Sequence, residues 1–251
     1  MIDLTGWHVL VTGGSRGIGA ACSRLFARAG AAVLVHYREQ EQAAEALVDE
    51  LLAISGRQHL RFPCDMGRPG EIKELFTFAT SEWGKLDCLV NNAGIWVHNP
   101  LAKLDRTLFD ETIRVNVLGP FLCAQEALPL LRRSQHASIV NLSSTSGQRG
   151  EAFYSPYSAS KGALISATKA WAMELAPQIR VNSVAPGWVD TDMSTPAFEG
   201  GGREEIEATI PLARIATPED IGGAVLFLAS PLARHITGEI LNVNGGSVLI
   251  G

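Results

Sequence analysis

Short runs of apolar residues alternate along the chain with longer segments in which apolar residues recur at helical spacing. Several short runs are apolar at consecutive positions, as at residues 9–11 and 33–35. Continuous rather than alternating hydrophobicity is typical of strands that are covered on both faces. We predict strands at residues 7–12, 32–37, 59–63, 88–91, 138–142, 180–185 and 239–243. We predict helices near residues 18–29, 40–52, 71–82, 107–132, 157–175 and 218–229.

This alternation of strands and helices predicts the α/β fold class. Helices that connect strands of one sheet form right-handed crossovers, and these produce a parallel, doubly wound sheet. We therefore expect about seven parallel strands flanked by helices. No linker, repeat or change in composition divides the sequence, so we expect a single domain over residues 1–251.

The connection at about residues 191–211 is longer than the others. It contains three consecutive glycines at residues 200–202, followed by glutamates at 204, 205 and 207. Glycine gives the backbone unusual freedom, and this segment follows the carboxyl end of a predicted strand, where functional loops gather. We predict a mobile substrate lid with one short helix. A plain solvated loop is the alternative.

Composition and charge exclude several classes of function. The 251 residues are 46% hydrophobic, which is enough for a folded core and excludes a disordered chain. The net charge is −5, so no overall basic field favours a nucleic-acid partner. The four cysteines and six histidines show no metal-ligand spacing, which predicts core cysteines, a reducing compartment and no metal site. The first residues do not resemble a signal peptide, and the longest apolar stretch, residues 221–233, is too short to span a bilayer. We expect a cytoplasmic protein with no membrane partner.

A glycine-rich segment, TGGSRGIG at residues 12–19, follows the first predicted strand and opens the first helix. Such a turn lets backbone N–H groups approach a pyrophosphate and directs a helix N-terminus at its negative charge. The spacing Gly13-x3-Gly17-x-Gly19 differs from the common G-x-G-x-x-G. We predict a dinucleotide site here; a tight turn without a ligand is the alternative.

The end of the second strand indicates which dinucleotide is bound. Proteins that bind NAD(H) place an acidic residue about 20 residues beyond the glycines, where it bonds the ribose 2′-hydroxyl. Here Tyr37 lies 18 residues after Gly19 and Arg38 follows. A guanidinium can bond a 2′-phosphate, and Arg16 in the turn supplies a second positive charge. This favours NADP(H) over NAD(H), unless Arg38 is a solvated surface residue.

Tyr157 and Lys161 are separated by four residues at the start of a predicted helix, and they therefore share one face. Ser155 is the expected N-cap of that helix. An ammonium near a phenol favours the phenolate, and lowering the pKa of tyrosine by about 3 corresponds to roughly 4 kcal/mol. A Tyr–Lys pair at this spacing is otherwise ordinary helix surface. Two further polar segments, at residues 141–144 and 91–94, end predicted strands at the sheet edge where such folds bind ligands.

Together these residues resemble the short-chain dehydrogenase/reductase family over essentially the whole chain. The matching motifs are TGGSRGIG at 12–19, NNAG at 91–94, Asn116, Ser144, YSASK at 157–161, PGWVDT at 186–191 and NVNGG at 242–246. Ser144 is preferred to Ser143 because it lies 13 residues before Tyr157, the interval that is usual in the family. The resemblance implies a Rossmann-type enzyme that transfers a hydride between nicotinamide C4 and a carbonyl or alcohol carbon.

The resemblance also implies catalytic roles. Tyr157 would be the general acid in reduction and the general base in oxidation, and Lys161 would lower its pKa and bond the nicotinamide ribose. Ser144 would donate a hydrogen bond to the substrate oxygen. Asn116 would hold a water that links Lys161 to solvent; its alternative role is to satisfy backbone groups near the irregularity at residues 119–120.

By the same resemblance, a larger set of residues would bind the cofactor, with Asp65 contacting adenine and Asn92 lining the site. The set is Gly13, Ser15, Arg16, Gly17, Ile18, Gly19, Tyr37, Arg38, Asp65, Met66, Asn92, Ala93, Gly94, Tyr157, Lys161, Pro186, Gly187, Val189 and Thr191. The substrate would contact Trp96, Ser144, Phe153, Tyr157, Trp188 and Met193 in a mainly apolar cavity.

The substrate is less well determined. The nearest subgroup is the 3-oxoacyl-carrier-protein reductases, with sugar or glucose dehydrogenases and small-ketone reductases as alternatives. Two positions that hold an acidic carrier protein in that subgroup are Gln135 and Gln178 here, although Arg132, Arg133 and Arg180 lie near them in the sequence. Family members form dimers or tetramers, and we expect a homotetramer. A dinucleotide-binding sensor without catalysis is a remote alternative, because the Ser, Tyr and Lys positions are all filled.

Overall fold

The computed structural model of the chain describes residues 2–249. Its seven-stranded sheet has the strand order β3-β2-β1-β4-β5-β6-β7, and every neighbouring pair is parallel. The strands are β1 His8–Val11, β2 Ala32–Tyr37, β3 Leu60–Pro63, β4 Cys88–Asn91, β5 Ser138–Leu142, β6 Arg180–Pro186 and β7 Ile240–Val243. The order reverses between β1 and β4, as in a doubly wound Rossmann-type sheet. The predicted fold class is confirmed.

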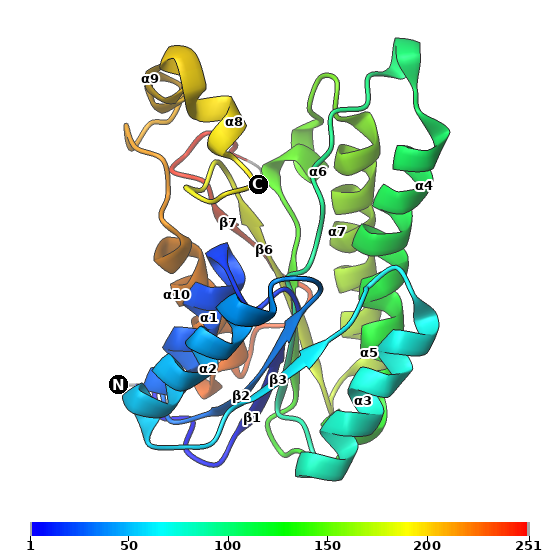
Figure 1. The fold of residues 1–251 in the computed structure, drawn as a ribbon, viewed down its shortest axis with the longest axis vertical. Helices are drawn as coiled ribbons and strands as arrows, with labels where there is room; N and C mark the ends of the chain where they lie inside the picture. The colour runs from blue at the N-terminus through cyan, green and yellow to red at the C-terminus, as the bar shows by residue number, and fades with distance from the viewer. Residues whose placement is uncertain (1, 250–251) are drawn as a thin grey trace.

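Helices cover both faces of the sheet (Figure 1). They are α1 Gly17–Arg28, α2 Glu41–Ser55, α3 Pro69–Trp83, α4 Arg106–Ile113, α5 Gly119–Leu131, α6 Thr145–Arg149, α7 Ser155–Leu175, α8 Thr195–Phe198, α9 Gly202–Ala208 and α10 Pro218–Ala229. A π-helical turn, Arg114–Leu118, joins α4 to α5, and 3-10 turns occur at Leu101–Lys103, Glu199–Gly201 and Pro231–Ala233.

The two faces of β1 explain the continuous apolar pattern of the strands. Val9 and Val11 are buried in a core shared with α1, α2 and α10. Leu10 is buried in a second core, shared with α3, α5 and α7. Successive side chains of a strand point to opposite faces, so a sheet with two cores needs apolar residues at consecutive positions.

Four local expectations are corrected by the structure. The helix predicted at residues 107–132 is divided by the π turn, and α5 begins after it at Gly119, where a Cβ would come within 2.8 Å of the Met66 carbonyl oxygen. The segment at residues 191–211 contains two short helices, α8 and α9, rather than one. Ser155 is the first residue of α7 and not its N-cap, a position that Tyr154 occupies without a side-chain bond. Helix α6 had no predicted counterpart, because TSGQR at residues 145–149 has no apolar periodicity.

The cysteines are core residues, as expected. Cys22, Cys64, Cys88 and Cys123 are all buried and unpaired. Burial raises the pKa of each thiol, so these side chains stay protonated and pack as small apolar groups. Among residues 2–249, none of the helices combines the length and hydropathy that crossing a lipid bilayer requires.

Candidate active site

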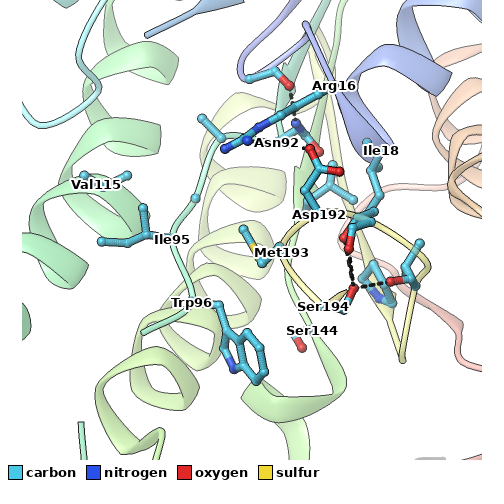
Figure 2. A pocket seen from close by; sticks show the side chains of 18 of the residues that line it. Arg16, Ile18, Asn92, Ile95, Trp96, Val115, Ser144, Asp192, Met193 and Ser194 are labelled. Atoms are coloured by element: carbon cyan, nitrogen blue, oxygen red, sulfur yellow. Dashed lines mark hydrogen bonds and ion pairs between the residues drawn. The ribbon is translucent and has the colours of Figure 1, made fainter. Parts of the chain in front are cut away.

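A cleft of about 400 Å³ lies at the carboxyl edge of the sheet, where the loops that follow six of the strands converge. Figure 2 shows Arg16 and Asp192 at one end of it and Trp96 and Ser144 at the other. Most predicted site residues line this cleft: Gly13, Ser15, Arg16, Gly17, Ile18, Tyr37, Arg38, Asp65, Met66, Asn92, Ala93, Gly94, Trp96, Ser144, Tyr157, Lys161, Pro186, Gly187, Trp188, Val189, Thr191 and Met193.

Three predicted residues do not line the cleft. Gly19 lies behind the glycine turn, where a Cβ would come within 2.1 Å of the Gly13 carbonyl oxygen. Asn116 is fully buried behind the wall formed by residues 93–95. Phe153 points away: it is 65% exposed, has a positive φ of 69°, and its ring lies 6.1 Å from that of His98. Phe153 therefore does not line the cleft in this structure, and its contact with substrate remains a prediction.

The glycine turn has the shape that a pyrophosphate requires. Gly13 and Gly17 have positive φ values of 61° and 51°, which favour glycine. Arg16 precedes α1 without a side-chain cap, so the first N–H groups of the helix keep their bonding capacity for a ligand. A Cβ at Gly13 would lie 3.1 Å from the Ala93 Cα. The turn is therefore packed closely against the segment that follows β4.

Asn92 and Thr12 fasten the glycine turn to the neighbouring strand. The Asn92 amide donates to the carbonyl oxygens of Thr12 at 2.8 Å and Gly13 at 3.1 Å. The Thr12 hydroxyl oxygen accepts from the backbone N–H groups of Asn92 at 2.9 Å and Ala93 at 3.0 Å. These bonds explain why an amide and small residues follow β4, since they fix the position of the turn before any ligand is bound.

His36 is a residue of this site that the sequence pattern did not reveal. It is buried at the end of β2, and its Nδ1 accepts the Gly13 N–H at 2.7 Å while Nε2 bonds the Cys64 carbonyl oxygen at 2.7 Å. Because Nδ1 accepts, the proton must be on Nε2, so the ring is neutral. Burial lowers the pKa of His36 to about 4. A polar residue inside an otherwise apolar strand was the available signal.

The two arginines predicted to recognise a 2′-phosphate are exposed at the cleft. Arg38 pairs with Glu39 at 2.9 Å, and Arg16 lies 3.7 Å from Asp192. Exposed ion pairs of this kind contribute little free energy, so both guanidinium groups can exchange their partners for a phosphate. Asp65 is more constrained, since its carboxylate accepts the Gly67 N–H at 2.8 Å.

Three of the four predicted catalytic side chains come from two elements, α6 and α7, that meet at the cleft wall. Ser144 is the N-cap of α6, and its hydroxyl oxygen accepts the Ser146 N–H at 3.1 Å. Tyr157 and Lys161 lie on one face of α7, with the Lys161 Nζ 5.7 Å from the centre of the Tyr157 ring. The Lys161 ammonium donates to the Leu142 carbonyl oxygen at 2.8 Å at the end of β5. The fold therefore brings Ser144, Tyr157 and Lys161 together in one cleft wall.

Burial dominates the electrostatics of the Tyr157–Lys161 pair. Burial raises the pKa of the Tyr157 phenol to about 12, a hydrogen bond with Ser144 opposes the change, and Glu151 reinforces it. Burial also lowers the pKa of Lys161 to about 8. Desolvation sets the direction of the change for Tyr157, and the lowering of this pKa by Lys161 remains a prediction.

Asn116 bonds the backbone of Ile95, after β4, rather than backbone groups at the irregularity at residues 119–120. It lies in the π turn, accepts the Ile95 N–H at 2.8 Å and donates to the Ile95 carbonyl oxygen at 2.9 Å. It also donates to the Ser160 hydroxyl at 3.1 Å. A Cβ at Gly94 would lie within 3.4 Å of both Asn116 Oδ1 and Lys161 Nζ, so Asn116 and Lys161 border the same backbone segment.

Aromatic side chains form the end of the cleft that lies away from Arg16. The Trp96 ring stacks on Tyr154 at 4.4 Å and meets the edge of Trp188 at 5.8 Å. Trp188 in turn lies 5.9 Å from Phe198 of α8. Aromatic pairs at these distances attract one another beyond the area they bury, so Trp96 is held in place. Tyr154 was not predicted to have this role.

The basic residues considered for a carrier protein lie at the opposite edge of the sheet. Arg132 and Arg133 precede β5 and Arg180 begins β6, so all three are near the amino ends of strands. The Arg180 guanidinium donates to the carbonyl oxygens of Leu228 at 2.6 Å and Ala229 at 2.7 Å. Arg180 therefore stabilises the end of α10.

Comparison with known proteins identifies the family. A family model described as enoyl-(acyl carrier protein) reductase matches residues 13–247. A solved structure from Brucella melitensis, a short-chain dehydrogenase/reductase of the glucose/ribitol dehydrogenase type, superposes with a TM-score of 0.94 at 31% identity and covers 99% of both chains. The chain belongs to the short-chain dehydrogenase/reductase family. It is therefore an oxidoreductase that acts on CH–OH or ketone groups, as the motifs predicted.

Two relatives and a second structure extend the comparison. A 3-oxoacyl-[acyl-carrier-protein] reductase of Staphylococcus aureus is 40% identical over 238 residues, which cover 94% of this chain and 96% of the relative. The enzyme of the same name from Synechocystis is 37% identical and covers 99% of this chain and all of the relative. A short-chain dehydrogenase from Burkholderia cenocepacia, solved in complex with NADP, has a TM-score of 0.92 at 35% identity and covers 98% of this chain and 99% of its own.

Proposed function

We propose that this short-chain dehydrogenase/reductase is an NADPH-dependent ketoreductase of the 3-oxoacyl reductase type. The observation that carries the proposal is the convergence of Ser144, Tyr157 and Lys161 on one cleft, whose other end is the glycine turn. Bound NADPH supplies a hydride to the substrate carbon. The chain contributes orientation, hydrogen-bond donors and a proton.

The residues present fit a dinucleotide. Gly13 and Gly17 leave the space that a Cβ would occupy, and the uncapped start of α1 faces a pyrophosphate. Arg38 and Arg16 line the cleft without an acidic residue at position 37, which favours NADPH over NADH. The structure from Burkholderia cenocepacia with NADP supports this choice. The cofactor residues are those given above, with Gly19 holding the turn from behind.

Reduction needs a proton at the substrate oxygen. Tyr157 is the proposed donor, and its high pKa keeps the phenol protonated at neutral pH. Ser144 donates a second hydrogen bond to the same oxygen, where negative charge grows as the carbonyl is reduced. Lys161, whose ammonium is bonded to the carbonyl oxygen of Leu142 at the end of β5, places a positive charge near the Tyr157 ring and would bond the ribose of the cofactor. Asn116 fixes the Ile95 backbone beside Lys161.

The names of the two relatives favour a 3-oxoacyl thioester as substrate. The wall of Trp96, Trp188 and Met193 accommodates an apolar acyl group. Because Gln135 and Gln178 supply no positive charge, a sugar or a small ketone is the second candidate. Similarity to the Brucella melitensis protein, which is of the glucose/ribitol dehydrogenase type, supports this second candidate.

The proposal also includes a substrate lid and an oligomeric state. The segment at residues 191–211 is a substrate lid, since Phe198 of α8 packs on Trp188 at the cleft.

Helices α5 and α7 expose Phe121 and Met173, and apolar exposed groups on adjacent helices favour association. We expect a homotetramer, which light scattering would measure.

The test is NADPH oxidation against acyl thioesters, diketones and sugars, scored as kcat/KM. We expect Tyr157→Phe to lower kcat by about 10²- to 10⁴-fold, because it removes the proton donor, while the Kd for NADPH changes less than about threefold. Near-normal turnover by this variant would contradict the mechanism. Tight NADPH binding without turnover of any carbonyl by the wild type would instead favour the sensor.

A further inference from the structure

Glu151 stands in the cleft wall between α6 and α7, in the segment that joins Ser144 to Tyr157. It is half-buried, and its backbone carbonyl oxygen accepts the Tyr154 N–H at 3.2 Å, which fixes the turn that leads into α7. An acidic residue that lines an apolar substrate site has to be explained, because partial burial of a carboxylate is unfavourable without a partner.

The partner of Glu151 is Ser146, and Ser146 is also a partner of Ser144. The Ser146 hydroxyl donates to the Glu151 carboxylate, and the Ser146 backbone N–H donates to the Ser144 hydroxyl oxygen at 3.1 Å. Two hydrogen bonds therefore connect Glu151 to Ser144 through one intermediate residue. Both bonds lie within the short helix α6 and the loop after it, where a segment of five residues has little stability of its own.

This connection determines what the Ser144 hydroxyl can do. A serine hydroxyl has one proton and two acceptor positions. The Ser146 N–H occupies one acceptor position of Ser144, so the proton of Ser144 cannot be directed at that amide and is directed into the cleft, toward the Tyr157 phenol or a substrate oxygen.

We propose that Glu151 is a positioning residue for the ketone reduction: through Ser146 it holds Ser144 with its hydroxyl proton directed at the substrate oxygen. The role rests on the proposed function, since it concerns the donor that the reaction uses. Glu151 does not touch the reacting atoms itself in this scheme. The Glu151 carboxylate holds the Ser146 hydroxyl, and the Ser146 backbone N–H in turn holds the Ser144 hydroxyl oxygen.

The charge of Glu151 has a second consequence at the same site. It reinforces the raised pKa of Tyr157 and so favours the protonated phenol that reduction requires. Besides Glu151, the charged side chains that line the cleft are Lys161, Arg149, Arg16, Asp192, Arg38, Glu39 and Asp65. Of these, only Lys161 and Arg149 come from α7 and α6, the two elements that flank Glu151.

Two substitutions separate these effects. Glu151→Gln keeps an acceptor for the Ser146 hydroxyl and removes the charge, whereas Glu151→Ala removes both. We expect Glu151→Ala to lower kcat for reduction about tenfold at pH 7 and to leave the Kd for NADPH unchanged. This loss is smaller than the roughly 10²- to 10³-fold loss of kcat that follows removal of a whole oxyanion donor, because Ser144 itself is still present. We expect Glu151→Gln to keep kcat within about threefold at pH 7 and to move the alkaline decline of kcat to lower pH, because the phenol then ionises more easily.

Ser146→Ala provides the decisive comparison. If Glu151 acts through Ser146, then Ser146→Ala, Glu151→Ala and the double variant should all lower kcat by the same factor, because groups that act as a unit are not additive. Glu82→Ala and Glu82→Gln, on the outer surface of α3, are the matched controls and should match the wild type.

The possible results separate the role of Glu151 from the function of the enzyme. Wild-type kcat in Glu151→Ala, or losses in Glu151→Ala and Ser146→Ala that multiply in the double variant, would overturn the proposed role while the ketoreductase function stands. A wild-type protein that reduces no carbonyl would overturn the function itself, and the role of Glu151 with it.

Discussion

His36 connects the position of the glycine turn to pH. Its neutral ring accepts the Gly13 N–H and bonds the Cys64 carbonyl oxygen, both at 2.7 Å, in a buried site. Protonation would turn Nδ1 from an acceptor into a second donor facing the Gly13 N–H. The folded protein therefore resists protonation of His36, whereas the unfolded chain does not. We predict that this difference makes the protein less stable in mild acid.

The magnitude follows from the pKa of His36. Burial lowers this pKa from 6.5 to about 4, while the bond to Cys64 and the attraction of Asp65 oppose the change. A group with a lowered pKa in the folded state contributes stability above its unfolded pKa and loses it as the pH falls toward the folded value. Between pH 7 and pH 5 we expect His36 to lower the free energy of unfolding by about 2 kcal/mol, at about 1.4 kcal/mol per pKa unit.

The assay compares wild type with His36→Asn in urea unfolding at pH 7 and pH 5. Asparagine keeps an acceptor near the position of Nδ1 but does not titrate, and it loses the bond to Cys64. The variant should be less stable at pH 7 by about 1 kcal/mol. Between the two pH values its free energy of unfolding should fall by about 2 kcal/mol less than that of the wild type. His8 and His59 also have lowered pKa values, but they are present in both proteins and cancel.

A control and a refuting result complete the experiment. His235→Gln changes an exposed histidine and should keep the pH dependence of the wild type. If His36→Asn shows the same loss of stability between pH 7 and pH 5 as the wild type, His36 does not titrate as its burial and hydrogen bonds require.

Two further predictions concern the cofactor end of the cleft. Gly19→Ala places a Cβ 2.1 Å from the Gly13 carbonyl oxygen, so we expect the turn to shift. Overpacking of about 1–3 kcal/mol implies that the Kd for NADPH, measured by calorimetry, rises about 10- to 100-fold. Gly223→Ala, with open space around the added Cβ, is the control and should bind NADPH normally. Arg38→Asp should weaken NADPH binding at least about tenfold and shift preference toward NADH; an unchanged preference between the two dinucleotides would contradict the assignment of Arg38.

The strands could be predicted because their apolar runs are short and alternate with longer helical segments. Val9, Leu10 and Val11 are consecutive apolar residues, and a strand with a core on each face buries all three. The glycine turn was equally clear, since Gly13 and Gly17 need positive φ values. In both cases a local property of the residues determines the local structure.

Helix α6 could not be predicted, because what stabilises it is distant in the sequence. Its residues carry no apolar period, and Gly147 is required where α6 crosses α7: a Cβ there would come within 2.6 Å of the Lys161 backbone carbon. That close approach of backbones depends on how α7 packs, which the sequence around residue 147 does not indicate. The contacts of Glu151, in the loop after α6, were hidden for the same reason.

The pKa of Tyr157 depends on surroundings that spacing along the chain does not indicate. The i,i+4 separation correctly places Lys161 on the same face of α7, and attraction between an ammonium and a phenolate is sound chemistry. The sequence does not show that the Lys161 ammonium bonds the Leu142 carbonyl oxygen or that Glu151 adds a negative charge nearby. With a pKa of about 12, ionising Tyr157 at pH 7 requires about 7 kcal/mol, against about 4 kcal/mol for a free phenol. The groups of the chain therefore keep the Tyr157 phenol protonated at neutral pH, which is the form that donates a proton in ketone reduction.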